Sequence, residues 1–534
     1  MTTFAYTLLA SAGGGGDFGY WATFIGGLNK PYCNSLFSAG SGIGADADGN
    51  LVYSVKADGV NGAYSALMYY VKKDDYSAIE SVCSSNWDNN NVGQTNDTYG
   101  MGGSITTGAG EADSGGRFVT AIAGASYTNR AYQTGKPETQ WGNASAQRMS
   151  SYRSATRPNN LLDSCIQKND NKKLWWLGDQ YNSPAQGAYN TQIGRWTQSS
   201  PTANWTTGTS ECRELGHGTA ATAQTSKGFS IASDSNGNAY VGGQFASPFS
   251  ANTNTYPWYG QIAVGNLNLN YIKAWETGLS NNQGVYRLTT GTGDNVYALY
   301  AAKGDTYTGS GNSYTQLLIT KFSGGAEQWT SCIGGGKSGS GYTSASASAV
   351  MGLGICVDDD ENIYAYFRSS QTSYFNQTDP SSSNADIKSA VISLNSSGAF
   401  RWCNVLGGNA GQSDSWDEGN GNRIIVDGQE GLNIMTSQSS ATINSSTYRG
   451  FFALRIPLDG SGTSSASVAI TGTNKDFYYN TSSEITSRFV GSVSTTEIIQ
   501  YTYNIVTGMD STIYTNTANE FVVPTDHLIK QEVL

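Results

Sequence analysis

The stretch DSNGNAYVGG, at residues 234–243, predicts an acidic turn followed by a short strand. Asp, Asn and Gly tolerate a positive φ and bond to their own backbone, which suits a tight hairpin. Looser copies are DADGNLVYSV at 46–55, GTGDNVYALY at 291–300 and DDDENIYAYF at 358–367. Because one chain repeats the same turn several times, the sequence indicates a repeat protein.

Each clear copy has a second half further along the chain, made of an apolar strand, a Gly turn, a Trp and a Gly-rich exit. The clearest example joins GICVDDDENIYAYF (354–367) to SAVISLNSSGAFRWCNVLGG (389–408). The aromatic residue after the turn indexes the copies: Tyr53, Tyr240, Tyr297 and Tyr364, with Asn433 in that place in the last. The last four positions are spaced by 57, 67 and 69 residues, and degenerate copies at Phe118 and Trp175 fill the gap after Tyr53. The spacing predicts seven units of about sixty residues, each with about four strands.

Composition supports a β protein. The chain has 534 residues, 66 of them Gly and only 13% charged, and no long window shows helical periodicity. A four-stranded sheet cannot bury both faces alone, whereas sheets repeated around an axis bury them against each other. We therefore predict an all-β fold, a seven-bladed β-propeller of four-stranded blades at 18–473, with irregular extensions at 1–17 and 474–534. A β-solenoid is the competing repeat architecture, but its periods are usually much shorter.

Closure of the ring is also suggested. FGYWATFIGG (18–27) matches the exit strands of later units although it precedes the first full unit, so the last blade could borrow this strand. SASVAI (465–470) could fill the same slot. The C-terminal stretch reads as further strands, and with the N-terminal ten residues it is expected to contact other subunits.

The repeat resembles the bacterial β-propeller repeats of many surface and secreted proteins. The resemblance rests on the pattern G-(x)-I-x-x-D-x-x-G-N-x-Y-V-x-G followed by I-x-L-x-x-S-G-x-x-x-W-x-x-x-L-G-G. It is good over 216–473, weaker over 40–100 and poor over 101–215, and it implies a fold and no activity. The Gly/Ser/Thr/Asn/Tyr-rich, Lys-poor texture also resembles tail and fibre proteins of bacteriophages, especially marine ones.

The acidic turns are compared with the sequence pattern of calcium-binding loops. Asp46, Asp48 and Asn50 begin like a calcium loop, but Leu51 and Ala57 stand where an EF-hand needs Gly and Glu. The cluster at 358–361 is denser, and hairpin chemistry with solvated charge explains it better than a bound cation. No metal site is predicted.

Catalytic signatures are missing as well. His217 and His527 are the two histidines, neither has a metal-binding spacing, and no G-x-S-x-G elbow occurs. The glycines at 13–16 lack the G-K-[ST] of a phosphate loop. Which acids could face each other for glycoside cleavage is not visible in sequence. We predict no catalytic residue, no cofactor-binding residue, no cofactor, and a protein that is not an enzyme.

Cysteines and tryptophans are interpreted as packing residues. The seven cysteines are odd in number and lack a CxxC pair, so neither a zinc site nor a disulfide scaffold is expected: Cys33, Cys83, Cys165, Cys212, Cys332, Cys356 and Cys403. Several lie in strand-like runs, as Cys356 and Cys403 do, and there a buried free thiol is expected. Four tryptophans lie in the least regular unit, where exposed rings could stack on sugars: Trp175, Trp176, Trp196 and Trp205. Packing between sheets is the favoured interpretation.

The net charge of −11 argues against nucleic acid as a partner, and no apolar run is long enough to cross a bilayer. The N-terminus lacks the basic region of a secretion signal. We therefore predict a non-enzymatic, tail-associated virion structural protein of a bacteriophage, assembled in the host cytoplasm, that docks to other virion subunits or to a host-surface glycan. The alternatives are a secreted or cell-surface bacterial propeller that binds carbohydrate or protein, and a glycan-degrading enzyme.

Overall fold

The computed structural model describes the strands given below and the tight turns that join some of them. Side chains are described at 42–44, 51, 53, 163–170, 173–178, 191–195, 197, 211, 213, 215, 228–244, 256–274, 284–300, 317–333, 352–367, 389–404, 423–427, 431–435 and 453–460. Among these residues we find strands, turns and one short 3-10 turn, η2 (Thr292–Asp294), and no helix long and apolar enough to cross a membrane. The chain is an all-β protein built of antiparallel sheets, as its composition predicts.

Three regular sheets lie in the middle of the chain, each made of four consecutive strands. The first holds β14 (Ser226–Ser233), β15 (Ala239–Ala246), β16 (Thr255–Ile262) and β17 (Leu269–Ala274). The second holds β18 (Val285–Thr290), β19 (Val296–Lys303), β20 (Thr315–Ser323) and β21 (Ala326–Ile333). The third holds β22 (Val350–Val357), β23 (Ile363–Ser369), β24 (Lys388–Leu394) and β25 (Phe400–Gly407).

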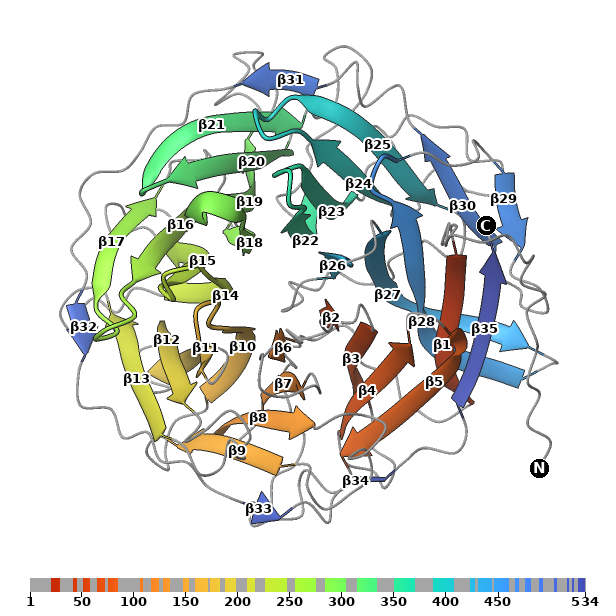
Figure 1. Ribbon diagram of the computed structural model, residues 1–534, viewed down its shortest axis with the longest axis horizontal. Helices are drawn as coiled ribbons and strands as arrows, with labels where there is room; N and C mark the ends of the chain where they lie inside the picture. The colour runs from red at the N-terminus through yellow and green to blue at the C-terminus, as the bar shows by residue number, and fades with distance from the viewer. Residues whose placement is uncertain are drawn as a thin grey trace.

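Three further sheets precede them in the sequence. They hold β2 (Gly42–Ala45), β3 (Leu51–Ala57), β4 (Ser65–Lys72) and β5 (Asp75–Ser84); β6 (Thr106–Gly108), β7 (Arg117–Ala123), β8 (Thr128–Thr134) and β9 (Gln147–Tyr152); and β10 (Asn159–Ile166), β11 (Lys173–Asn182), β12 (Ala188–Thr197) and β13 (Thr209–Gly216). Figure 1 shows all the sheets arranged in a ring, with the first strand of each sheet towards the centre.

The remaining sheet is assembled from both ends of the sequence. It begins with β26 (Ile424–Val426), β27 (Gly431–Ile443) and β28 (Ser446–Pro457), and its next strand is β1 (Trp21–Leu28). Trp21 pairs with Arg455 and Leu28 with Tyr448, so eight residues of β1 run antiparallel to β28. The short strand β29 (Ala466–Ala469) lies elsewhere, paired with β30 (Asp476–Thr481).

A chain of short strands near the C-terminus forms a belt around the outside of the ring (Figure 1). We call the strands β30 to β35 the C-terminal belt; after β30 they are β31 (Phe489–Ser492), β32 (Asn504–Val506), β33 (Asn516–Thr517), β34 (Phe521–Val522) and β35 (His527–Val533). In that order they pair with the outer strands β25, β21, β13, β9, β5 and β1. The belt therefore follows the ring in the direction opposite to the order of the sheets.

The core lies between neighbouring sheets. Tyr297, Leu299 and Ile319 of the second regular sheet share one cluster with Ile355 and Phe367 of the third, all essentially unexposed. Equivalent clusters join the first regular sheet to the sheets on either side of it. Alternating side chains of each strand point to opposite faces, so each sheet contributes to two such clusters.

The strand register shows that Tyr53 is not equivalent to the tyrosines of the later repeats. Tyr240, Tyr297 and Tyr364 each lie opposite the residue two positions before the turn, whereas Tyr53 lies opposite Ile43, three positions before Asp46. A shift of one residue moves a side chain to the other face of a sheet. Tyr53 is therefore buried on the opposite face from the other tyrosines, although the turn before it looks the same.

Candidate functional site

The repeated acidic turn is closed by its own carboxylate. Asp234 accepts hydrogen bonds from the backbone N of Asn238 at 2.8 Å, from Asn238 Nδ2 at 3.0 Å and from the Tyr240 hydroxyl at 3.3 Å. Asp358 repeats the arrangement with Asn362 and Tyr364, at 2.8, 2.9 and 2.8 Å. The aspartate, the asparagine four residues on and the tyrosine six residues on thus form one hydrogen-bonded unit, which fixes the hairpin.

The last full copy keeps the same carboxylate with different partners. Asp427 accepts from the backbone N of Gly431 at 2.8 Å, from Asn433 Nδ2 at 2.8 Å and from Arg455 Nε at 2.9 Å. Asn433 stands in the tyrosine position and donates to the same carboxylate oxygen. Both charged side chains are almost fully buried, so the pair depends on these bonds to offset its desolvation.

One turn lacks its own aspartate, and the neighbouring turn supplies the carboxylate. Gly291 stands where Asp234 and Asp358 stand in the other copies. Glu361, from the turn of the next sheet, reaches across and accepts from Asn295 Nδ2 and from Lys321 Nζ, both at 2.7 Å. A Cβ on Gly291 would lie 2.9 Å from Glu361 Oε1, so the glycine leaves the space that the glutamate fills. Burial alone would raise the pKa of Glu361, but these hydrogen bonds outweigh it and hold the pKa below its ordinary value.

Successive turns are joined to each other in the same way. Asn169 Nδ2 donates to the carbonyl of Asn236 at 2.6 Å. Asp294 of the following turn accepts from the backbone N of Ser235 at 2.6 Å and from Asn236 Nδ2 at 2.9 Å. Asp294 and Glu361 thus join neighbouring sheets, whereas Asp234 and Asp358 close their own turns. In the part of the chain that the structure describes, no group of three His, Cys, Asp or Glu side chains could hold a metal ion.

The aromatic residue of the fourth strand covers the hairpin of the next sheet. Trp329 Nε1 donates to the carbonyl of Ser396, and Trp402 Nε1 to that of Leu458, both at 3.1 Å. In the first regular sheet Tyr271 takes the same strand position and lies against Gly325. The exit tryptophan of the repeat is therefore a contact between sheets.

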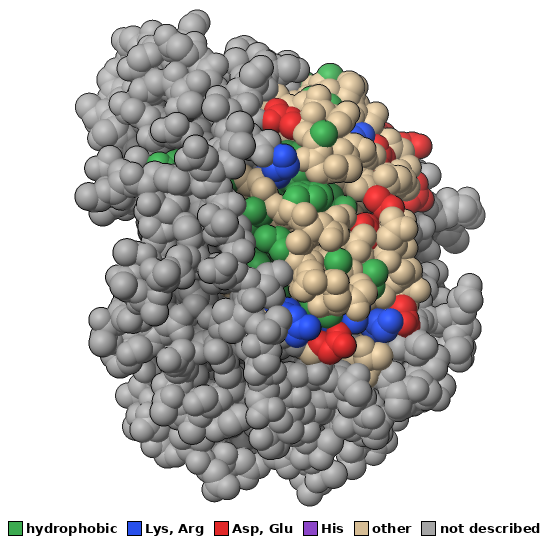
Figure 2. Space-filling model, turned by 90° about the vertical axis from the view of Figure 1, so that its left-hand side faces the viewer, with side chains coloured by type: hydrophobic (Ala, Val, Ile, Leu, Met, Phe, Trp, Pro, Cys, Tyr) green, Lys and Arg blue, Asp and Glu red, His purple; other side chains and the backbone are tan. Residues whose placement is uncertain are grey.

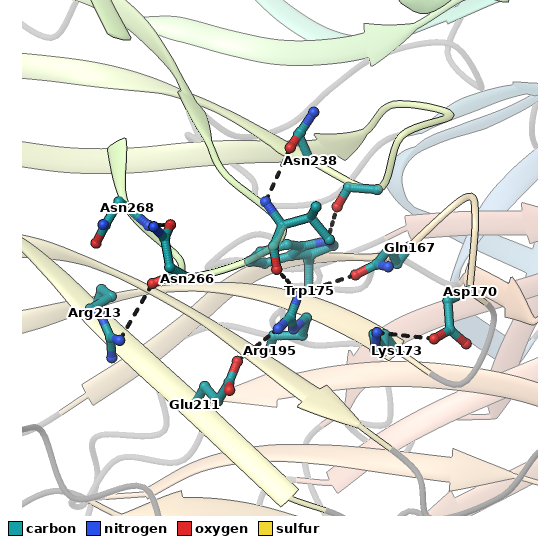
Figure 3. Close-up of polar contacts among 12 residues, drawn as sticks. Gln167, Asp170, Lys173, Trp175, Arg195, Glu211, Arg213, Asn238, Asn266 and Asn268 are labelled. Carbon is teal, nitrogen blue, oxygen red and sulfur yellow. Dashed lines mark hydrogen bonds and ion pairs between the residues drawn. The ribbon is translucent and has the colours of Figure 1, made fainter. Parts of the chain in front are cut away.

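The most connected polar cluster lies where the irregular third unit meets the first regular sheet (Figure 3). Arg195, whose side chain is mostly buried, pairs with Glu211 at 2.8 Å and donates to the carbonyl of Val264. Its guanidinium lies 5.1 Å from the centre of the Trp175 ring. Trp175 Nε1 donates to the carbonyl of Gly237 at 3.2 Å. The bonds of Arg195 to Val264 and of Trp175 to Gly237 join two sheets, and the ion pair with Glu211 orients Arg195.

A second charged cluster lies on the innermost strands. The register of β10, β14, β18 and β22 shifts near Leu162, Phe229, Tyr286 and Leu353, each five residues before its turn. The residues after the first three are Asp163, Ser230 and Arg287, all buried. A β-bulge re-aims the side chains beside it, and the same bulge recurs in four sheets.

These three residues each bond to the next sheet. Asp163 Oδ2 accepts from the backbone N of Ile231 at 3.0 Å, and Ser230 Oγ accepts from Leu288 N at 3.1 Å. Arg287 Nε donates to the carbonyl of Leu353 at 3.3 Å. At each of these three sheet boundaries a side chain at the same repeat position thus bonds across, and the three residues differ chemically. Thr290 Oγ1 adds a bond to the carbonyl of Ser233 at 2.6 Å.

Burial raises the pKa of the Asp163 carboxyl to about 6, although the charge of Arg287 and the two backbone N–H bonds act to lower it. Burial likewise lowers the pKa of Arg287 to about 10, with Asp163 opposing the change. A carboxyl that titrates near neutrality is a candidate for proton transfer. Here both carboxylate oxygens accept backbone N–H groups, which assigns Asp163 to joining sheets.

The structure places only part of the residues that the sequence singles out. Trp175 and Trp176 are buried, which confirms packing as their role. Cys165, Cys332, Cys356 and Cys403 are buried free thiols whose pKa burial raises, as expected. The side chains of other candidates lie outside the described residues: Asp46, Asp48, Cys33, Cys83, Cys212, Trp196, Trp205, His217 and His527.

The two faces of the ring differ in their connections. In the three regular sheets, the first strand joins the second, and the third joins the fourth, through at most six residues. Strand alternation places these turns on one face, which we call the turn face. The other connections, which begin and end on the opposite face, run over 247–254, 275–284, 304–314, 334–349, 370–387 and 408–423. The turn face holds contacts between sheets, and the long connections begin and end on the opposite face.

Charge is mixed over the described surface. Figure 2 views the ring from the side of β13 and β17, and the acidic and basic side chains that it colours are interspersed among polar ones. The described surface in this view shows no broad field of one sign.

No protein-family model and no curated protein matches the chain. Two polysaccharide lyases are among the solved structures that are similar to it. One is the polysaccharide lyase PL25, an ulvan lyase, bound to -[GlcA(1-4)Rha3S]-, with 10% identity, a TM-score of 0.37, and coverage of 78% of this chain and 94% of the lyase. The other is the same kind of lyase with 10% identity, a TM-score of 0.35, and coverage of 85% and 99%.

These neighbours correct the function expected from the sequence. The prediction was a non-enzymatic virion structural protein, yet the structures found are enzymes that act on a polysaccharide, and neither is a phage protein. The prediction was drawn from absent motifs and overall composition, and neither feature has a physical link to one function. At this level of similarity, a reaction and a substrate are not transferred to the chain.

Proposed function

We propose that the protein is a seven-bladed β-propeller that degrades polysaccharide on the face opposite the turn face. The difference between the two faces carries the proposal. Each sheet is one blade of four strands, and the belt adds an outer strand to most of them. Several side chains of the turn face bond to the neighbouring blade, among them Asp294, Glu361 and Trp329, which favours the long connections as the place for a substrate.

The composition of those connections supports a carbohydrate ligand. The segments 304–314, 334–349 and 370–387 consist largely of Ser, Thr, Asn and Gly, and each contains at least one Tyr or Phe. Hydroxyl and amide groups match the hydrogen-bonding groups of sugars, and aromatic rings offer flat apolar surfaces. Recognition loops on other rigid β scaffolds use the same residue types.

One histidine can be singled out by its position in the sequence, next to the end of a fourth strand. His217 directly follows Gly216, the last residue of β13, and a fourth strand ends on the face with the long connections. A histidine is the side chain best suited to proton transfer near pH 7. We propose His217 as the first residue to test for catalysis.

The test is an assay of the purified protein against neutral, uronate-containing and sulfated polysaccharides. Elimination is followed by the ultraviolet absorbance of the unsaturated product, and hydrolysis by new reducing ends. We expect turnover of at least one polysaccharide, and its loss in His217→Gln with unchanged thermal unfolding. Asp359→Asn, at an exposed position of the turn face, is the matched control and should retain full activity.

Two results would overturn the proposal. The first is the absence of any product across the whole panel from a protein that is folded by circular dichroism. The second is a loss of activity in Asp359→Asn that equals the loss in His217→Gln, because it would place the chemistry on the turn face or make the effect unspecific.

A further inference from the structure

Two buried arginines occupy equivalent positions on the innermost part of the ring. Arg287 stands four residues before Gly291, where its turn begins, and Arg423 stands four residues before Asp427. Both residues are almost completely enclosed, with exposed fractions of 2% and 3%. Arg287 belongs to β18 and Arg423 immediately precedes β26, and Figure 1 shows these two strands at the centre of the ring with β22 between them.

The two arginines meet at one carbonyl group of the sheet between them. Arg287 Nε and the backbone N of Arg423 both donate to the carbonyl of Leu353, each at 3.3 Å. The next residue, Gly354, holds the equivalent position in this sheet, four residues before Asp358. At this repeat position, the sheet that separates the two arginines therefore contributes no side chain of its own.

The charges at this repeat position are not balanced. Among the described residues, Asp163 is the acid whose charge acts on Arg287, and it already accepts backbone N–H groups with both oxygens. The charge of Arg423 acts in the opposite direction and adds to the effect of burial, which lowers the pKa of Arg287 to about 10. Enclosing like charges together costs free energy, and an accompanying opposite charge offsets that cost.

We propose that a small inorganic oxyanion, sulfate or phosphate, binds at the centre of the ring between the guanidinium groups of Arg287 and Arg423. A guanidinium group offers N–H donors in a planar fork that matches the oxygens of such an anion. Arg287 uses Nε and Nη1 for the carbonyls of Leu353 and Tyr286, and its Nη2 is assigned to the anion.

The second arginine is suited to the same task. Arg423 bonds to the neighbouring sheet through its backbone N, so this contact between sheets does not depend on its side chain. Because both arginines are almost fully enclosed, the site suits a free ion and excludes a sulfated polysaccharide chain. The proposal is therefore independent of the polysaccharide activity proposed above.

The experiment is equilibrium dialysis of the full-length protein against radiolabelled inorganic sulfate at pH 7 and constant ionic strength. We expect saturable binding that inorganic phosphate displaces and a sulfated polysaccharide does not. Arg423→Gln should weaken binding about tenfold or more, because charged hydrogen bonds to the anion are lost. Asp163→Asn should strengthen it, because a negative charge that competes for Arg287 is removed.

The matched control is Arg195→Gln, which removes a mostly buried guanidinium from another sheet boundary and should leave binding unchanged. Arg423→Lys covers the case in which Arg423→Gln does not fold. It keeps the positive charge, loses the planar fork, and should bind sulfate more weakly than the parent protein.

Several results would overturn the proposal. They are the absence of saturable sulfate binding in the parent protein, binding in Arg423→Lys as tight as in the parent, and unchanged or weaker binding in Asp163→Asn. A loss in Arg195→Gln equal to that in the Arg423 variants would make the effect unspecific. Displacement by a sulfated polysaccharide would place the bound anion on an open surface, and would equally overturn it.

Discussion

Glu361 provides the carboxylate that the neighbouring turn lacks at position 291. This role can be tested by placing an aspartate at position 291 and removing the acid at position 361. Gly291→Asp alone should destabilise the protein, because its side chain would meet the Glu361 carboxylate. Glu361→Asn alone should cost about 1–3 kcal/mol, since Asn295 and Lys321 lose a charged acceptor. The double variant should be more stable than the sum of the two losses predicts, because the turn regains a carboxylate.

The check is a double-mutant cycle from denaturant unfolding at pH 7. Asn suits position 361, whose φ is +60°, and position 291 has a φ of −90°, which any residue adopts. Strictly additive losses would show that an aspartate at 291 does not replace the glutamate.

Asp163 should make stability depend on pH in a definite direction. Its pKa is about 6 in the folded protein and 3.8 without burial, so the folded state binds the proton more tightly. The resulting stabilisation is complete below pH 3.8 and is lost as the pH rises through 6, a change on the order of 3 kcal/mol. Relative to Asp163→Asn, the parent protein should therefore lose stability between pH 4 and pH 7.

The measurement is the difference in denaturant unfolding free energy between parent and variant at several pH values. Thr290→Val is the matched control, because the Thr290 hydroxyl donates to the carbonyl of Ser233 on the neighbouring sheet and does not titrate. Its difference from the parent protein should be the same at every pH. A parallel pH dependence in both variants would contradict the assignment to Asp163.

Sequence alone could predict the local part of these networks. Asp234, Asn238 and Tyr240 lie within seven residues, so turn chemistry and strand pairing already bring them together. Asn295 and Glu361 are 66 residues apart and meet because two sheets pack side by side. No local pattern marks the glutamate as a substitute for an aspartate missing from another unit.

At the scale of single elements, the hairpin between β20 and β21 offers a matched pair of glycines. Both have positive φ, but a Cβ on Gly325 would lie 2.9 Å from the Tyr271 ring, whereas one on Gly324 would meet nothing within 4 Å. Gly324→Ala should cost about 1–2 kcal/mol from backbone strain alone. Gly325→Ala should cost more, about 2–4 kcal/mol, because the ring must move.

Denaturant unfolding of the two variants measures these costs. In a Tyr271→Leu background the extra cost at Gly325 should largely disappear, since the smaller side chain leaves room for the methyl group. Equal costs at the two positions would show that the aromatic cover does not constrain the hairpin.

The elements also show where repeat patterns mislead. The repeat pattern calls for a tryptophan in the fourth strand, but in the first regular sheet the register puts Tyr271 opposite Gln261, where Trp329 lies opposite Lys321 in the next sheet. The function of the position, an aromatic cover for the next hairpin, is kept by a different residue. Periodicity predicts strands well, and it does not fix which aromatic residue makes the contact.

For the whole molecule, the pairing of β35 with β1 should be a main source of stability. Ile529 lies opposite Ile25 in a run of seven paired residues. Ile529→Pro should cost about 3 kcal/mol, because proline disrupts the strand and removes a donor. Ile529→Val keeps the strand and should change stability by less than about 1.5 kcal/mol.

Thermal and denaturant unfolding report the change, and exchange of the β1 amides locates it. Unaltered stability in Ile529→Pro would mean that β35 adds nothing to the ring. The belt itself could not be predicted from sequence, because several of its strands are only two or three residues long and none follows the repeat. Contact with other subunits was expected for this stretch, and its described strands pair with sheets of the same chain.

The pairing of β1 with β28 and β35 has a consequence for how fast the protein reaches its native state. These strands bring together residues about 430 to 510 positions apart in the sequence, which is near the largest separation that the chain allows. Contacts of such long range form late, because closing the loop costs conformational entropy before the contact contributes any stabilisation. We expect refolding to show a slow final phase, in which β1 pairs with β28 and β35 after the other sheets have formed.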